Sequence, residues 1–167
     1  PLISTDMTRC IHCSRCVRFG EEISNVKELG LLNRGENMKI DVFIESSVSS
    51  ELSGNMIDLC PVGALNNKPY RYTARTWDLR QICGISPHDC IGSNINYHTY
   101  NNKIVRAVPS ENPDINQTWL SDRDRFGYEG IYSEDRIKKS QMRVDGKLVE
   151  IDFDSIPSQV NNLINNN

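Results

Sequence analysis

The sequence of 167 residues predicts an α+β fold built from short elements. Strand-like runs are separated by turn residues, as at Tyr100-Asn101-Asn102, and this pattern predicts hairpins. The candidate helices are all short. Hydrophobic residues make up 38% and aromatic residues 7% of the chain, which is lean for a single large core. We therefore expect small modules whose stability is completed by a cofactor or a partner subunit.

The first of three expected modules covers residues 1–72. It should begin with a cysteine-rich loop that runs from Thr8 to Cys16. The loop should be followed by a helix over 17–26. Two strands, 30–33 and 38–44, should flank the turn Arg34-Gly35-Glu36-Asn37. A second helix, capped by Ser49 or Ser50, should run toward Leu59.

The other two modules are expected to be richer in strands. The second module, residues 73–135, should contain the strands 76–82, 94–99 and 103–108. The third module, residues 136–167, should contain the strands 142–144 and 147–153 around Asp145-Gly146, and then a helix over 155–164 with Pro157 in its first turn.

Composition and charge exclude several classes of protein. The net charge of −3 argues against nucleic acid as a partner. No run of 18 apolar residues occurs, so we expect no transmembrane helix. The opening residues lack the basic start and apolar stretch of a signal peptide, and the first residue is Pro1 rather than methionine. We therefore expect an interior fragment or a processed product.

The strongest motif is formed by four of the six cysteines. Cys10, Cys13, Cys16 and Cys60-Pro61 have the spacing C-x2-C-x2-C-x43-C-P. A [4Fe–4S] cube offers four irons, and each iron takes one thiolate. Two-residue gaps let a tight loop reach three irons, and a distant cysteine can then complete the site. Because three cysteines are clustered and no secretory signal precedes them, we predict an iron–sulfur site in a reducing compartment.

Two other uses of these thiols stay open. A structural zinc site also takes four thiolates, although it usually shows two separated C-x2-C pairs. The cysteines could also be free buried thiols. The neighbouring His12 is expected at the surface or in a hydrogen bond, since four thiolates are already available. Arg9, Arg15 and Arg18 form either a solvated basic face or a partial counter-charge to the cluster.

Two stretches of the sequence, Met7 to Phe19 and Cys60 to Leu65, resemble a known family. The family is the large iron–sulfur subunit (G-type) of proton-pumping NADH:quinone oxidoreductase, respiratory complex I. Weaker similarity continues in the same order downstream, in these segments: Thr76-Trp77-Asp78-Leu79, Ile91-Gly92-Ser93-Asn94, Leu120 to Phe126, and Asp145 to Ile151.

The resemblance implies an electron relay rather than a self-sufficient catalyst. Cys10, Cys13, Cys16 and Cys60 would hold one [4Fe–4S] cluster, and we expect no catalytic residue. Electrons would pass from NADH and flavin on a neighbouring subunit toward quinone. The partners would be other peripheral-arm subunits of complex I, without direct insertion into the membrane. The site would lie on the cytoplasmic face of a bacterial inner membrane or on the mitochondrial matrix side.

The resemblance also implies the architecture. The [4Fe–4S] module would be followed by a β-rich domain of the molybdopterin-oxidoreductase type and by the start of a truncated large domain. Some family members carry a second cluster, and the corresponding positions here are Cys83, Ser86, Cys90 and Ser121. Two thiolates cannot hold a cube well, so we predict that this second site is empty and that both cysteines are small buried residues.

Other functions remain as alternatives to the complex I relay. One is the related iron–sulfur module of a formate dehydrogenase or an iron hydrogenase. Another, from a different class, is a zinc-stabilised interaction module. The charged run from Asp122 to Arg125 could suggest a catalytic cluster, but we interpret it as an ion-paired turn at a surface or an interface.

Overall fold

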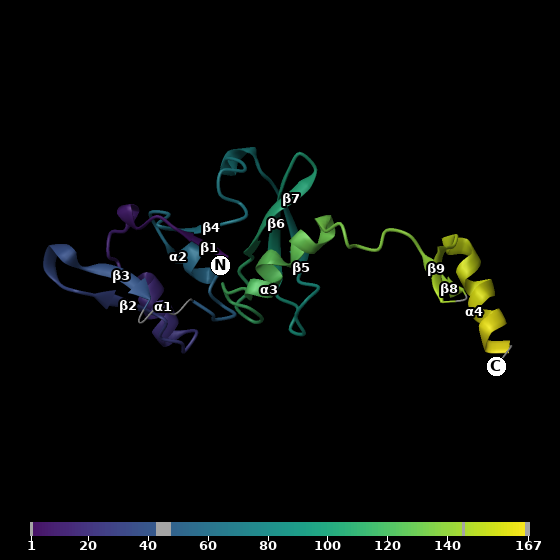
Figure 1. The fold of residues 1–167 in the computed structure, drawn as a ribbon. Coiled ribbons are helices and arrows are strands. Elements are labelled where there is room, and N and C mark those ends of the chain that lie inside the picture. Colours follow the sequence, from purple (N-terminus) through teal and green to yellow (C-terminus); the bar gives the residue numbers. More distant parts are fainter. Residues whose placement is uncertain (1, 43–47, 145, 166–167) are drawn as a thin grey trace. The chain divides into compact units, whose positions relative to one another are not determined.

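The computed structural model describes residues 2–42, 48–144 and 146–165, and they form two compact units, 1–129 and 130–167. Figure 1 shows short helices and separate antiparallel sheets in chain order, which confirms the α+β class. The boundaries expected after residues 72 and 135 stay predictions. The expected strand end at Phe43 and Ile44 and the turn residue Asp145 lie outside the described residues.

The first half of unit 1 contains two small sheets and two helices. Strand β1 pairs with the distant β4, whereas β2 pairs with its neighbour β3, both in antiparallel register. The elements are β1 (Ile3–Thr5), α1 (Arg15–Glu22), β2 (Leu29–Leu32), β3 (Lys39–Val42), α2 (Asn55–Leu59) and β4 (Leu65–Asn67). Turns of 3₁₀ helix cover Met7–Arg9 and Gly35–Asn37.

The second half of unit 1 is built around a three-stranded antiparallel sheet in the order β5-β6-β7. The elements are β5 (Arg80–Ile85), β6 (Asn94–Tyr100), β7 (Lys103–Pro109) and α3 (Asp122–Phe126), with 3₁₀ helix at Thr76–Asp78 and Gly127–Tyr132. The hairpin expected at 94–108 is confirmed. Asn101 and Asn102 both have left-handed backbones, with φ of 48° and 60°, which suits a two-residue hairpin loop.

Unit 2 is a hairpin followed by a helix. Strand β8 (Gln141–Val144) pairs with β9 (Lys147–Glu150), and a 3₁₀ turn at Phe153–Ser155 leads into α4 (Ile156–Asn165). The tail helix is therefore confirmed, with Pro157 in its first turn. None of the described residues of α4 is buried.

Two hydrophobic clusters hold unit 1. One joins the three-stranded sheet to the segment around α3, through Ile95, Ala107, Leu120 and Tyr128. The other joins α1, α2 and β4 through Phe19, Met56 and Leu65, and Cys16 and Cys60 pack against it. Two of the predicted ligands therefore rest on a packed apolar core.

Two expected elements differ in the structure. Ser49 and Ser50 do not cap α2, which begins at Asn55; they donate hydrogen bonds to the Glu28 carboxylate instead. The strand expected from Thr76 begins only at Arg80, because residues 76–78 form a 3₁₀ turn. In the part of the chain that the structure describes, the helices are too short and too polar to cross a bilayer.

Candidate metal centre

The loop that carries three of the cysteines has an unusual backbone. His12 and Ser14 both adopt left-handed conformations, with φ of 54° and 58°. This conformation is uncommon for residues other than glycine and is typical of turns. Helix α1 begins directly afterwards and places Cys16 in its first turn. The loop is thus a compact turn that ends on a helix.

The fourth cysteine reaches this loop because two distant strands pair. Thr5 lies opposite Leu65 in the β1–β4 ladder, and the Asp6 N–H donates to the Ala64 carbonyl at 2.7 Å. These contacts lay the chain after Cys60 against the chain before Cys10. Cys60 itself ends α2 in an extended conformation.

All four predicted cysteines line one cavity. The other residues around it are mainly apolar: Met7, Ile11, Arg15, Ile40, Val62, Ala64 and Leu65. Within the described residues, no three His, Cys, Asp or Glu side chains stand close enough together to hold a single metal ion. Each thiolate of a cube binds a different iron, so four thiols around one apolar cavity fit the donor set of a cluster.

Backbone N–H groups point at two of the sulfurs. The His12 N–H donates to the Cys10 Sγ at 3.4 Å, and the Ala64 N–H donates to the Cys60 Sγ at 3.2 Å. Burial raises the pKa of the Cys16 thiol, although N–H groups of the first helical turn oppose this effect. Donors of this kind stabilise the negative charge on sulfur.

The charged residues of the loop differ in their surroundings. Arg9 forms an ion pair with Asp6 at 3.0 Å, and Arg18 forms one with Glu22 at 3.0 Å on the exposed face of α1. Arg15 lines the cavity. Of the three arginines, Arg15 is therefore the one whose position fits a counter-charge to the cluster.

The second predicted site has a different arrangement from the one expected. Cys83 and Cys90 are exposed, so the prediction that they are buried is wrong. Cys83 lies on the edge strand β5, which exposes most of its side chains. Ser86 is buried and donates a hydrogen bond to Asp124. Ser121 donates to the other carboxylate oxygen of Asp124 at 2.6 Å. The two serines thus meet on a shared carboxylate.

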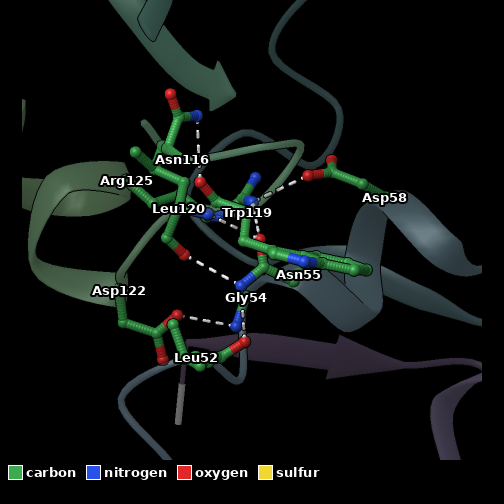
Figure 2. A network of polar contacts seen from close by, with 9 residues as sticks. All are labelled: Leu52, Gly54, Asn55, Asp58, Asn116, Trp119, Leu120, Asp122 and Arg125. Atoms are coloured by element: carbon green, nitrogen blue, oxygen red, sulfur yellow. Dashed lines mark hydrogen bonds and ion pairs between the residues drawn. The ribbon is translucent and has the colours of Figure 1, made fainter. Parts of the chain in front are cut away.

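The charged run from Asp122 to Arg125 was expected as an ion-paired turn at a surface or an interface; Arg125 does form an ion pair, with Asp58, but most of the run is buried. Asp122, Asp124 and Arg125 are buried in α3, and only Arg123 is exposed. Figure 2 shows that Asp122 and Arg125 point toward α2. Burial raises the pKa of Asp122, despite hydrogen bonds from Ser53 and Gly54.

The buried Asn55 is the main residue that sequence reasoning missed. It exposes 1% of its surface and bonds to the backbone of Leu120 through both ends of its amide. A lone asparagine in a polar stretch carries no spacing signal, so nothing in the sequence distinguishes it. For α3 the sequence does carry a signal: a serine at position 121 followed by acidic residues is typical of a helix start, and the Ser121 side chain does accept a hydrogen bond from the Asp124 N–H.

Comparison with known proteins matches both halves of unit 1 to family models. Residues 1–66 match the family model of NADH-quinone oxidoreductase subunit 3, ferredoxin-like domain. Residues 79–129 match the family model of the NADH-ubiquinone oxidoreductase NDSU1/NuoG-like, 4Fe-4S domain. The first match contains all four predicted ligands, and the second contains Cys83, Ser86, Cys90 and Ser121, the four positions of the predicted second site.

Curated relatives agree with these models. The chain is 47% identical to the G-type subunit of NADH-quinone oxidoreductase from Rickettsia bellii over 92% of this chain, and 48% identical to that of Rickettsia typhi over 92%. It is 50% identical to the NADH-ubiquinone oxidoreductase 75 kDa subunit of Reclinomonas americana over 78%. The chain spans only 22%, 22% and 19% of these relatives. Over that span, it belongs to the family of G-type subunits of NADH-quinone oxidoreductase.

Proposed function

We propose that this chain is an electron-relay segment of an NADH:quinone oxidoreductase and holds one [4Fe–4S] cluster. The observation that carries the proposal is the single cavity lined by Cys10, Cys13, Cys16 and Cys60. The names of the matched families and relatives support the same reading. The cluster would supply one-electron chemistry, which the side chains of the protein do not have.

The residues of the chain would bind the cluster and tune it. Each cysteine would hold one iron. The N–H groups of His12 and Ala64 would stabilise the reduced cluster through their hydrogen bonds to sulfur, and the apolar lining would limit the access of water. Arg15 would add a nearby positive charge, which favours the reduced state.

The setting of this relay is also part of the proposal. Electrons would come from NADH through a flavin on a neighbouring subunit and would leave toward quinone. The partners would be other subunits of the peripheral arm, on the cytoplasmic face of a bacterial membrane or the mitochondrial matrix side. The enzymatic reaction, proton-translocating NADH oxidation, would belong to the whole assembly.

The second domain would belong to the molybdopterin-oxidoreductase type and would hold no cluster. Two of its four expected ligand positions are serines, and both hydroxyl groups bond to Asp124. The cysteines at the other two positions are exposed to solvent. This domain would then act as a structural support for the cluster module.

Iron and sulfide analysis of an anaerobic preparation tests the proposal, followed by low-temperature EPR after dithionite reduction. About four irons and four sulfides per chain would support one cube. About eight irons would contradict the empty second site. Zinc without sulfide would overturn the relay and favour the zinc-stabilised module.

Substitution of single cysteines tests which of them bind the cluster. Cys60→Ala should abolish the EPR signal of the intact cube, because one iron loses its thiolate. Cys83→Ala and Cys90→Ala are the matched controls, and both should keep the iron content and signal of the parent. If Cys83→Ala removed iron, the assignment of ligands would be wrong.

A further inference from the structure

The segment from Trp119 to Arg125, in the second half of unit 1, contacts both helices that carry predicted ligands. The Trp119 ring lies 5.1 Å from the Phe19 ring, centroid to centroid, and the two rings are tilted by 49°. Phe19 is buried on α1, the helix whose first turn holds Cys16. Leu120, the next residue, bonds through its backbone to Asn55 of α2, the helix whose C-cap is Cys60.

The start of α2 is held by a carboxylate from α3. The Ser53 hydroxyl donates to Asp122 Oδ2 at 2.5 Å, and the Gly54 N–H donates to Asp122 Oδ1 at 2.6 Å. The backbone N–H of Asp122 in turn donates to the Glu51 carbonyl at 2.7 Å. The two segments are therefore joined in both directions, as Figure 2 shows for the Gly54 contact.

The first residue of α2, Asn55, is held by Leu120 and Arg125. Its Nδ2 donates to the Leu120 carbonyl at 2.9 Å, and its Oδ1 accepts from the Leu120 N–H at 3.0 Å. The same Oδ1 accepts from Arg125 Nη2 at 3.1 Å. These contacts are buried, so water does not compete with them.

The end of α2 is held by Arg125. Its Nη2 also forms an ion pair with Asp58 Oδ2 at 2.7 Å. Asn55 and Asp58 are three residues apart, so they share a face of the helix. The guanidinium therefore spans α2 from its first residue to a point two residues before Cys60. The backbone of Gly54 leaves the room that this side chain occupies, since a Cβ there would lie 2.6 Å from Arg125 Cδ.

This network has a high desolvation cost, because it buries the charge of Arg125. Arg125 exposes 1% of its surface, and its buried Nε has no hydrogen-bond partner among the described residues. A buried charge stabilises a fold poorly compared with apolar packing, because its desolvation offsets much of the Coulomb attraction. Directional contacts do, however, fix one position of the helix, which apolar packing alone specifies less sharply.

We propose that Arg125 is a positioning residue for the cluster: with Asn55 and Asp122 it fixes α2 and thereby places the Cys60 thiolate. This inference rests on the proposed function. A helix of five residues does not hold its own position, because its few internal hydrogen bonds barely offset the cost of forming it. Any shift of α2 is passed directly to Cys60, which ends it. Partners behind metal ligands commonly change metal affinity 10- to 100-fold.

The test compares Arg125→Met with Arg123→Met. Both changes remove a positive charge from α3, but Arg123 is exposed. We measure the rate of iron loss to a ferrous chelator and the midpoint potential of the cluster by EPR-monitored titration. Arg125→Met should lose iron at least about tenfold faster and shift the potential, whereas Arg123→Met should stay within about twofold of the parent. Arg125→Lys keeps the charge and a donor and should recover part of the loss.

Two results would overturn the proposal. One is an Arg125→Met variant that keeps the parent's iron-release rate and potential. If that variant does not fold, as judged by circular dichroism of the cluster-free chain, Asp58→Asn decides. Asp58 is 38% exposed in its side chain, so the change is tolerated, yet it removes the ion pair to Arg125. Iron release at the parent's rate would then refute the placement of Cys60 through the ion pair between Arg125 and Asp58.

The proposed function fails in a different way. A parent chain without iron and sulfide would refute the relay before any variant is compared. A parent with a normal cluster, and an Arg125→Met variant that behaves in the same way, would refute only the positioning role.

Discussion

At the residue scale, Gly54 shows how tightly the two halves of unit 1 approach each other. An added Cβ would lie 2.6 Å from Arg125 Cδ and 2.7 Å from Asp122 Oδ1. Both neighbours are buried and hydrogen-bonded, so neither can move aside at low cost. We expect Gly54→Ala to lower the free energy of unfolding by about 1–3 kcal/mol, measured by urea denaturation.

Gly30→Ala is the control for this prediction. Gly30 lies in β2, and no described heavy atom lies within 4 Å of a Cβ added there. We expect a change of no more than about 0.5 kcal/mol. Equal effects of the two substitutions would show that the approach of α3 to α2 is not tight.

Single residues also mark where sequence reasoning succeeds and where it ends. The four ligand candidates follow from thiolate chemistry and spacing, and the structure places them around one cavity. The pairing of Ser86 and Ser121 through Asp124 could not be predicted, because it depends on which side chains face each other after folding. Burial of Arg125 was missed for the same reason: an isolated charged run is usually solvated.

At the element scale, the loop between β5 and β6 is held by one carboxylate. Asp89 accepts hydrogen bonds from the Gly92 N–H at 2.8 Å and the Ser93 N–H at 3.1 Å. Burial raises the pKa of Asp89, but hydrogen bonds from the hydroxyl and N–H of Ser93 and from the N–H groups of Gly92 and Ile91 outweigh it, so the pKa is lowered overall. The ionised form therefore stabilises the folded loop.

The sign of this shift makes the prediction pH-dependent. A lowered pKa gives stability that is present above the unfolded value of about 3.9 and is lost as the pH falls through the folded value. Asp89→Ala should cost about 1–2 kcal/mol at pH 7, and the difference from the parent should shrink toward pH 3. Urea unfolding of the cluster-free chain measures both.

Elements were predicted well where local chemistry determines them. The turn at Asn101-Asn102 favours left-handed backbone, so the β6–β7 hairpin follows from the sequence. Helix α2 was placed too early because serine often caps helices, whereas Ser49 and Ser50 here bind a carboxylate from a distant segment. A long-range contact of this kind overrides a local preference.

At the scale of the whole molecule, unit 2 should contribute little to the cluster. The residues of its helix that expose large apolar side chains are Val160, Leu163 and Ile164. A chain that ends at Tyr132 keeps the 3₁₀ helix that follows α3. We expect it to fold and to hold the same iron and sulfide per chain as the parent. Loss of iron in this shorter chain would show that unit 2 supports the cluster module.

The β1–β4 pairing has a consequence for the order of events during synthesis. The ribosome synthesises the three cysteines of the loop first and adds 43 further residues before it reaches Cys60. At about 5–20 residues per second, that interval lasts roughly 2–9 s. During it, three thiols have no fourth partner, and neighbouring pairs are open to oxidation. On the proposed function, a complete set of four thiolates would therefore form only after the nascent chain has passed Asn67, the last residue of the β1–β4 pairing.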